Sequence, residues 1–265
     1  MPYFQRDNAS LFYISEGKGQ PILFLHGWAC DSQDFIFQIP FFQSLNYRTV
    51  VFDARGHGRS SIPSVSDPEQ LRPEVTSDDA TALLEHLGIT QQTPVIVVGH
   101  SLGCLTASLL AVRSPELVKA LVLIDPMYYQ TADAHAGFTK ALSGGRSHEV
   151  LAHSFGTKSV TKDTPEWLKT WHRMRLLGTP EWVVYQTAYQ KNVVEPAIGN
   201  WEVCRDHLAK RNCPRLVVLK DKDNMEKEKG LGSTRVDRFE IVGAGHWLHV
   251  QEADRFNAIV QEWLP

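Results

Sequence analysis

The feature that most constrains this chain is Gly-His-Ser-Leu-Gly at 99–103, which joins an apolar run at 94–98 to a helical pattern over 102–112. A serine in such a turn has a strained backbone, and side chains in place of its flanking glycines would collide with neighbouring backbone. The turn exposes the serine hydroxyl at the start of a helix, whose dipole stabilises negative charge. The sequence therefore predicts that Ser101 is a nucleophile.

Compact apolar runs recur along the chain, and patterns with helical spacing separate them. The runs lack the alternation of a half-exposed strand, which is typical of strands buried on both faces of a parallel sheet. We therefore expect an α/β fold with a doubly wound, mostly parallel sheet. The predicted strands cover 21–25, 49–53, 94–99, 119–125, 214–220 and 238–243, and helices are expected over 77–87, 102–112 and 252–263.

The segment from 127 to 201 breaks this alternation, because it contains helical patterns and no strand-like apolar run. We interpret it as a helical cap subdomain inserted into a core made of 1–126 and 202–265. So short a segment has little core of its own, so some of its aromatic rings should line a cleft above Ser101. The side chains expected to bind substrate are Trp28, Trp167, Trp171, Trp182 and Tyr185.

A serine hydroxyl needs a base with a pKa near 7 within hydrogen-bonding reach, and histidine supplies one. Among the 11 histidines, His246 lies in Gly-Ala-Gly-His-Trp at 243–247, directly after the last predicted strand. The position favours His246 as the base, with His249 as its nearest rival.

The negative charge that forms on an attacked carbonyl oxygen needs hydrogen-bond donors. In a site of this type one donor is the residue after the nucleophile, and the second comes from the loop after an early strand. His-Gly-Trp at 26–28 follows the strand predicted over 21–25. The backbone N–H groups of Leu102 and Trp28 are therefore the expected oxyanion hole.

These motifs resemble the α/β-hydrolase family, in which the nucleophile, acid and histidine follow one another in this order along the chain. Asp-Ala-Arg-Gly-His-Gly-Arg-Ser at 53–60 is similar to a turn of the same family, and the resemblance covers residues 10–264. It implies the fold predicted above, with residues 127–200 as the family's cap.

The acid that orients the histidine is the point where the chain departs from the family's pattern. The usual family position follows the strand at 214–220 and indicates Asp223, with Asp221 behind it, but that loop is crowded with lysines. Asp125 ends the strand at 119–125, beside the nucleophile's strand, where some family members carry the acid. We favour Asp125, and Asp223 stays open as its rival.

The resemblance implies a serine hydrolase that forms an acyl-enzyme on a small to medium, largely apolar or aromatic ester or lactone. Serine in the turn argues against dehalogenase and epoxide hydrolase chemistry, which uses Asp there. Cofactor-free dioxygenases that open hydroxyquinolone rings are similar in their Gly-Trp, here at 27–28, and in an acid placed like Asp125. Such an enzyme, a carbon–carbon bond hydrolase and a ligand-binding receptor with a silent triad are the alternatives.

Composition excludes several other classes. The chain has 27 Lys plus Arg against 30 Asp plus Glu, so it lacks the basic excess of a nucleic-acid binder. No apolar stretch is long enough for a membrane span, and the first residues do not form a secretory signal. The expected partner is a small-molecule substrate, and the expected setting is a cytoplasmic monomer or homodimer. No cofactor or metal is expected, because Cys30, Cys104, Cys204 and Cys213 lack metal-site spacing.

Overall fold

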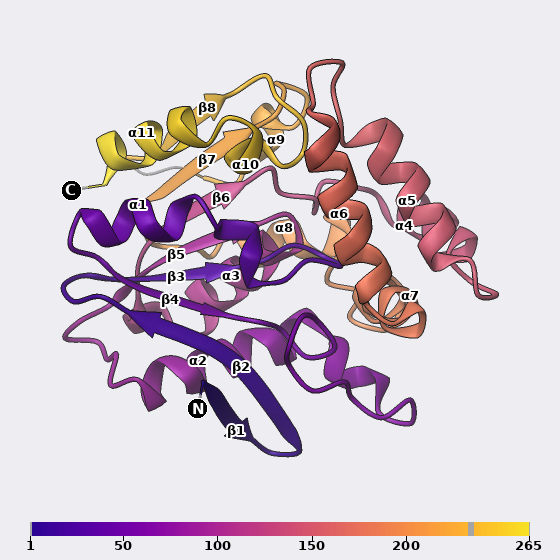
Figure 1. The fold of residues 1–265 in the computed structure, drawn as a ribbon, viewed down its shortest axis with the longest axis horizontal. Coiled ribbons are helices and arrows are strands. Elements are labelled where there is room, and N and C mark those ends of the chain that lie inside the picture. Colours follow the sequence, from indigo (N-terminus) through magenta and orange to yellow (C-terminus); the bar gives the residue numbers. More distant parts are fainter. Residues whose placement is uncertain (1, 233–235, 265) are drawn as a thin grey trace.

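A computed structural model describes residues 2–232 and 236–264. Its centre is an eight-stranded sheet with the order β1-β2-β4-β3-β5-β6-β7-β8 (Figure 1). From β4 to β8 all neighbouring strands are parallel, which confirms the predicted α/β class. The strands are β1 (Tyr3–Arg6), β2 (Ala9–Glu16), β3 (Pro21–Leu25), β4 (Arg48–Phe52), β5 (Val95–His100), β6 (Val118–Ile124), β7 (Arg215–Leu219) and β8 (Arg238–Ile241).

The six parallel strands coincide with the six predicted apolar runs, within a few residues at each end. The antiparallel pair β1 and β2 was not predicted. It extends the sheet at one edge, where β2 pairs with β4. Only three side chains of β2 are fully buried, so the pair lacks the apolar run that marks the inner strands.

Two cores lie on the two faces of the sheet, because successive side chains of a strand point to opposite faces. On β3, Leu23 contributes to the core under α2, α3 and α8, whereas Phe24 contributes to the core under α1, α10 and α11. Each face of the inner strands is therefore covered. The helices are α1 (Gln38–Ser44), α2 (Pro73–His86), α3 (Leu102–Arg113), α8 (Trp201–Leu208), α9 (Met225–Lys229), α10 (Leu248–Gln251) and α11 (Ala253–Trp263), with 3₁₀ turns η1 (Ser32–Phe35), η2 (Pro68–Leu71) and η3 (Pro115–Leu117).

The predicted cap segment, which lies wholly in the described part of the chain, contains helices joined by turns and no strand. It forms α4 (Ala132–Ala141), α5 (Ser147–Lys158), α6 (Glu166–Gly178) and α7 (Glu181–Asn192), which lie together at one side of the sheet (Figure 1). A small core between these helices includes Leu142, Leu151, Leu176 and Val184. The exact limits of the cap at 127 and 201 stay a prediction.

None of the helices within the described ranges has the length and apolar character that crossing a bilayer requires.

Candidate active site

The turn after β5 places Ser101 at the first residue before α3, with a backbone φ of 54°. A Cβ atom at Gly99 would collide with the backbone of Gly103, and one at Gly103 would collide with the carbonyl of Leu25. Both glycines are therefore required by close backbone approach, as the sequence predicted. The local structure is the strained strand–turn–helix in which a nucleophilic serine is presented.

His246 follows β8 and lies in the same cavity as Ser101. Its Nδ1 donates a hydrogen bond of 2.5 Å to Asp125 Oδ2, and both side chains are buried. Asp125 stands directly after β6, where its backbone N–H donates to the carbonyl of Val218 at 2.8 Å. The hydrogen bond at Nδ1 leaves His246 Nε2 as the nitrogen that can accept a proton.

Asp223, the rival acid, lies elsewhere. It is exposed, and its backbone N–H donates to Asp221 Oδ1 at 3.0 Å. Within residues 2–232 and 236–264, no hydrogen bond or ion pair joins either of these two carboxylates to His246. The geometry therefore supports Asp125 as the partner of the histidine.

Burial and nearby charges have opposite effects on the pKa values of Asp125 and His246. Burial alone would raise the pKa of Asp125, but the hydrogen bond and charge of His246, together with Lys220, lower it on balance. Burial lowers the pKa of His246, and the favourable effect of Asp125 compensates only in part. Asp125 is therefore ionised and His246 neutral near pH 7, which are the states that a general base and its orienting acid need.

The loop after β3 approaches the nucleophile closely. A Cβ atom at Gly27 would lie 2.9 Å from His100 Nδ1 and 3.3 Å from Ser101 Cβ. The next residue, Trp28, lines the cavity, as does Leu102. No acceptor is found for the N–H group of either residue in the described part of the chain. Both N–H groups are therefore available for an oxyanion.

A buried ion-pair network holds the loop of Gly27 and the loop of His246. Asp34, in η1, accepts from the backbone N–H of Gly27 at 3.3 Å and lies 2.7 Å from His100 Nδ1. His100 Nε2 lies 3.2 Å from the carbonyl oxygen of His246. From the cap, Arg175 donates to Asp34 Oδ1 at 3.0 Å. One carboxylate thus connects the cap, the predicted oxyanion loop and the histidine loop, a connection that the sequence analysis missed because η1 carries no recognisable motif.

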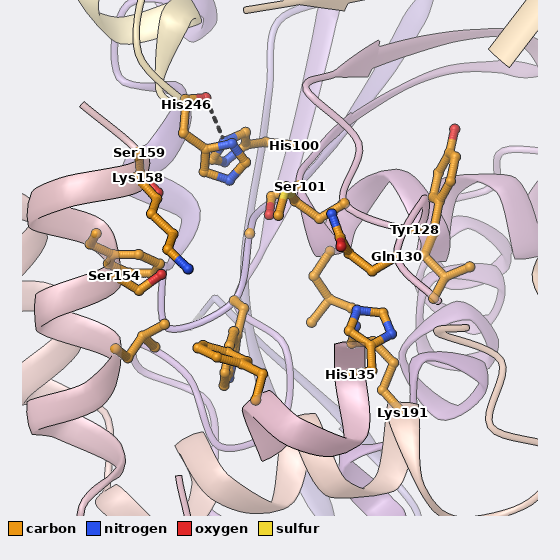
Figure 2. Close-up of a pocket in the computed structure, with 18 of the residues that line it drawn as sticks. His100, Ser101, Tyr128, Gln130, His135, Ser154, Lys158, Ser159, Lys191 and His246 are labelled. Carbon is orange, nitrogen blue, oxygen red and sulfur yellow. Dashed lines mark hydrogen bonds between the residues drawn. The ribbon is translucent and has the colours of Figure 1, made fainter. Parts of the chain in front are cut away.

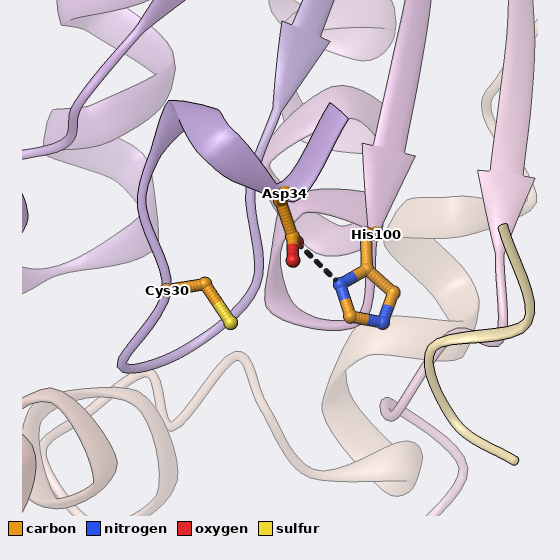
Figure 3. Close-up of side chains that lie close together, drawn as sticks. All are labelled: Cys30, Asp34 and His100. Atoms are coloured by element: carbon orange, nitrogen blue, oxygen red, sulfur yellow. Dashed lines mark hydrogen bonds and ion pairs between the residues drawn. The ribbon is translucent and has the colours of Figure 1, made fainter. Parts of the chain in front are cut away.

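Cys30, Asp34 and His100 are near enough to share a cation, since one ligand atom from each lies within 4.8 Å of the others (Figure 3). The donor set does not fit a metal. Burial raises the pKa of the Cys30 thiol, so it stays protonated. Both oxygens of Asp34 already accept hydrogen bonds, from Arg175 and from Gly27. The cluster is therefore explained by the ion pair.

A cavity of about 320 Å³ opens above Ser101, between the sheet and the cap (Figure 2). Its volume is at the low end for small-molecule sites, so it suits a small substrate. Much of its wall is apolar and aromatic, as expected for an organic ligand. The aromatic lining residues are Trp28, Tyr128, Phe138, Phe155 and Trp247.

Four of the five side chains expected to bind substrate are not part of this lining, and only Trp28 is. Trp167 is 53% exposed, and Trp171 packs on Arg175, with the guanidinium carbon 4.4 Å from the ring centroid. Trp182 also lies outside the lining, and Tyr185 stacks on Tyr189. The cavity therefore gives no support to these four as substrate-binding residues. Helical spacing shows which residues share a face, but not where that face points.

The polar lining residues outside the turns of Ser101 and His246 went unpredicted. They are Gln130, His135, Ser154, Lys158, Ser159, Lys191 and Asn192. The two lysines stand at the ends of cap helices, where lysine is also the ordinary choice for a solvated helix end. Nothing in their spacing distinguishes a lysine that faces a cavity from one that faces water.

The sequence of the chain is similar to those of known proteins. A family model described as "Alpha/beta hydrolase family" matches residues 22–259. The chain is 26% identical to the (E)-2-((N-methylformamido)methylene)succinate hydrolase of Acinetobacter baylyi, over 97% of this chain and 95% of the relative. It is 31% identical to a non-heme haloperoxidase of Rhodococcus erythropolis, over 55% of each chain.

Among solved structures, an enol-lactonase from Burkholderia xenovorans superposes with a TM-score of 0.82. The two proteins are 19% identical, and the superposition covers 99% of each chain. At this level of identity the likeness concerns the fold alone.

Proposed function

The chain belongs to the α/β-hydrolase family, and from this premise we propose that it is a serine hydrolase acting on a small ester or lactone through an acyl-enzyme. The observation that carries the proposal is one cavity that holds Ser101 at its strained turn together with His246, whose Nδ1 is fixed by Asp125. The hydrolase of Acinetobacter baylyi to which the chain is similar supports the same reaction class.

In the proposed mechanism, Ser101 Oγ attacks the substrate carbonyl and His246 Nε2 takes the hydroxyl proton. Asp125 keeps the imidazole in the required tautomer and stabilises the imidazolium. The N–H groups of Trp28 and Leu102 bind the oxyanion, where each donor of this kind contributes roughly 10²–10³-fold to the rate. The imidazolium then protonates the leaving alcohol, and the neutral imidazole activates a water that releases the acid and restores the serine.

A second candidate is a cofactor-free dioxygenase that opens a hydroxyquinolone-like ring. The observation that favours it is the contact of His246 with Asp125 instead of Asp223, because the resembling dioxygenases carry their acid after the same strand. In that reaction the histidine and aspartate remove a substrate proton and the serine only orients the substrate. Oxygen consumption on adding such a heterocycle distinguishes this reaction from hydrolysis.

Covalent trapping tests the proposed acyl-enzyme. A fluorophosphonate probe should label the protein at one position, and peptide mass mapping should place the label on Ser101, because His246 activates that hydroxyl. Short para-nitrophenyl esters should block the labelling in competition. A protein that hydrolyses none of an ester and lactone panel and takes up no probe would contradict the proposal.

The pH dependence of the reaction should report His246. The base must be neutral to accept a proton, and burial lowers its pKa below the ordinary value. On a neutral ester we therefore expect kcat/KM to rise with pH through one ionisation with a midpoint below about 6.5 and then to level off near neutrality. Initial rates measured in buffers of different pH and constant ionic strength give the rising part of this profile. A midpoint above pH 8 would contradict the role given to His246.

A further inference from the structure

Two lysine side chains from the cap reach the cavity that contains Ser101. Lys158 is the last residue of α5, and Lys191 lies in the last turn of α7. In Figure 2 they belong to different walls, with Lys158 near Ser154 and Lys191 near His135. The mechanism proposed above uses neither amine.

Neither ammonium group has a carboxylate partner within residues 2–232 and 236–264, whereas many other cations of the chain do. Among the residues that the structure describes, those lining the cavity include no Asp or Glu. The whole chain has a net charge of -3, so the positive character is local to this cavity. Such a local excess attracts an anion and raises its concentration at the site.

Lys191 is held in place by the backbone beside it. A Cβ atom at Gly199 would lie 2.7 Å from Lys191 Cγ and 3.1 Å from its Nζ, so the absence of a side chain there makes room for the lysine. The backbone N–H of Gly199 also donates to the carbonyl of Lys191 at 2.9 Å. The lysine side chain is therefore packed against the backbone of Gly199.

Burial lowers the pKa of Lys191 to about 8, so it remains mostly charged at neutral pH. Its neighbour His135, which shares a hydrogen bond with Asn200 at 2.9 Å, has its pKa lowered to about 3 by burial and by the charge of Lys191. Of the described residues on this wall, Lys191 thus carries the positive charge. Lys191 is half-buried. A partly desolvated ammonium without a counter-ion is unfavourable, and an anionic ligand would relieve that cost.

We propose that Lys191, with Lys158 on the other wall, forms a carboxylate subsite, and that the substrate is an ester or lactone carrying at least one free carboxylate. This inference rests on the proposed hydrolase function and narrows its substrate class. It also replaces the largely apolar substrate expected from the sequence. The aromatic rings of the lining then contact the carbon skeleton, and the lysines set which end of the substrate faces Ser101.

A matched pair of esters tests the subsite. The mono-para-nitrophenyl ester of adipic acid and para-nitrophenyl hexanoate have the same chain length and leaving group, and differ in a terminal carboxylate against a methyl group. We expect wild-type kcat/KM to favour the adipate ester by about tenfold or more, since a hydrogen bond between charged groups is stronger than one between neutral groups. A ratio near one would overturn the inference while leaving the hydrolase proposal intact.

Variants assign the effect to the lysines. Lys191→Met and Lys158→Met should each lower the ratio of the two kcat/KM values, mainly by raising KM for the adipate ester, and Lys191→Arg should retain part of it. Lys140→Met is the matched control, because Lys140 is exposed on α4 and outside the lining. The hexanoate activity of each variant shows that its active site is still formed. An unchanged ratio in Lys191→Met would overturn the assignment.

Binding without turnover separates the subsite from the chemistry. Adipate should bind the Ser101→Ala protein in calorimetry, and the Lys191→Met change should weaken that binding about tenfold or more. If wild type hydrolyses neither ester but adipate binding still depends on Lys191, the hydrolase proposal fails and the subsite stands. If adipate does not bind, the subsite fails.

Discussion

Replacement of Ser101 by alanine is expected to lower kcat for ester hydrolysis by about 10⁴-fold or more. Without the hydroxyl no acyl-enzyme can form. The residual rate enhancement then comes from substrate binding and from the N–H groups of Trp28 and Leu102. The fold should survive, because alanine is smaller than serine at a position whose φ of 54° the surrounding structure already imposes. Steady-state kinetics and a thermal melt measure the two effects separately.

Two further variants show whether the loss of activity in Ser101→Ala is due to the missing hydroxyl. Ser143→Ala, at an exposed cap position, should keep wild-type activity. The double variant Ser101→Ala with His246→Ala should be no worse than Ser101→Ala alone, because residues that act as one unit are not additive. If Ser101→Ala retains more than a tenth of the activity, or if the two losses multiply, the acyl-enzyme mechanism is wrong. The first outcome would favour a reaction driven by His246 without the serine.

The central sheet could be predicted because its strands are buried on both faces. Each therefore appears in the sequence as an apolar run, as in 21–25 and 214–220. The Ser101 turn was equally clear, since only glycine fits at 99 and 103. The edge pair β1 and β2 was missed because a partly exposed antiparallel strand such as Ala9–Glu16 has no continuous apolar run.

The orientation of the cap helices could not be predicted from the sequence. The helical segments were recognisable, but the orientation of each helix is set by contacts with the others and with the core. Trp171 thus packs on Arg175, which is tied to Asp34 in the core. Lys191 faces the cavity because Gly199 leaves room beside it. Such pairings join residues from different elements, and no spacing within one helix encodes them.

The sequence leaves two candidates for the acid that orients His246, and the structure distinguishes them. From the sequence, Asp125 and Asp223 both stand at the carboxyl ends of strands, which face the site in a parallel sheet. In the structure, β6 is the direct neighbour of β5, so Asp125 is placed beside the nucleophile by the sheet itself. Asp223 belongs to the loop between β7 and α9, where it is exposed.

Asp125→Asn should therefore be nearly inactive, whereas Asp223→Asn should stay within about tenfold of wild type. Asparagine fills the space of Asp125 but no longer accepts the His246 Nδ1 proton as a carboxylate does, and the resulting wrong tautomer typically lowers kcat by around 10⁴-fold. Both variants replace a carboxylate by an amide, so each is the control for the other. Kinetics on one neutral ester, with melting curves for both proteins, measure the difference.

The pH profile adds a second criterion for the acid. Asp125 raises the pKa of His246 against the opposing effect of burial, so its loss should lower that pKa further. The residual activity of Asp125→Asn should then have its rising limb at a lower pH than wild type, and the profile of Asp223→Asn should not move. If Asp223→Asn is the inactive variant and Asp125→Asn keeps its rate, the usual family position holds the acid. That result would also remove the support for a dioxygenase, since that alternative depends on the same Asp125 carboxylate.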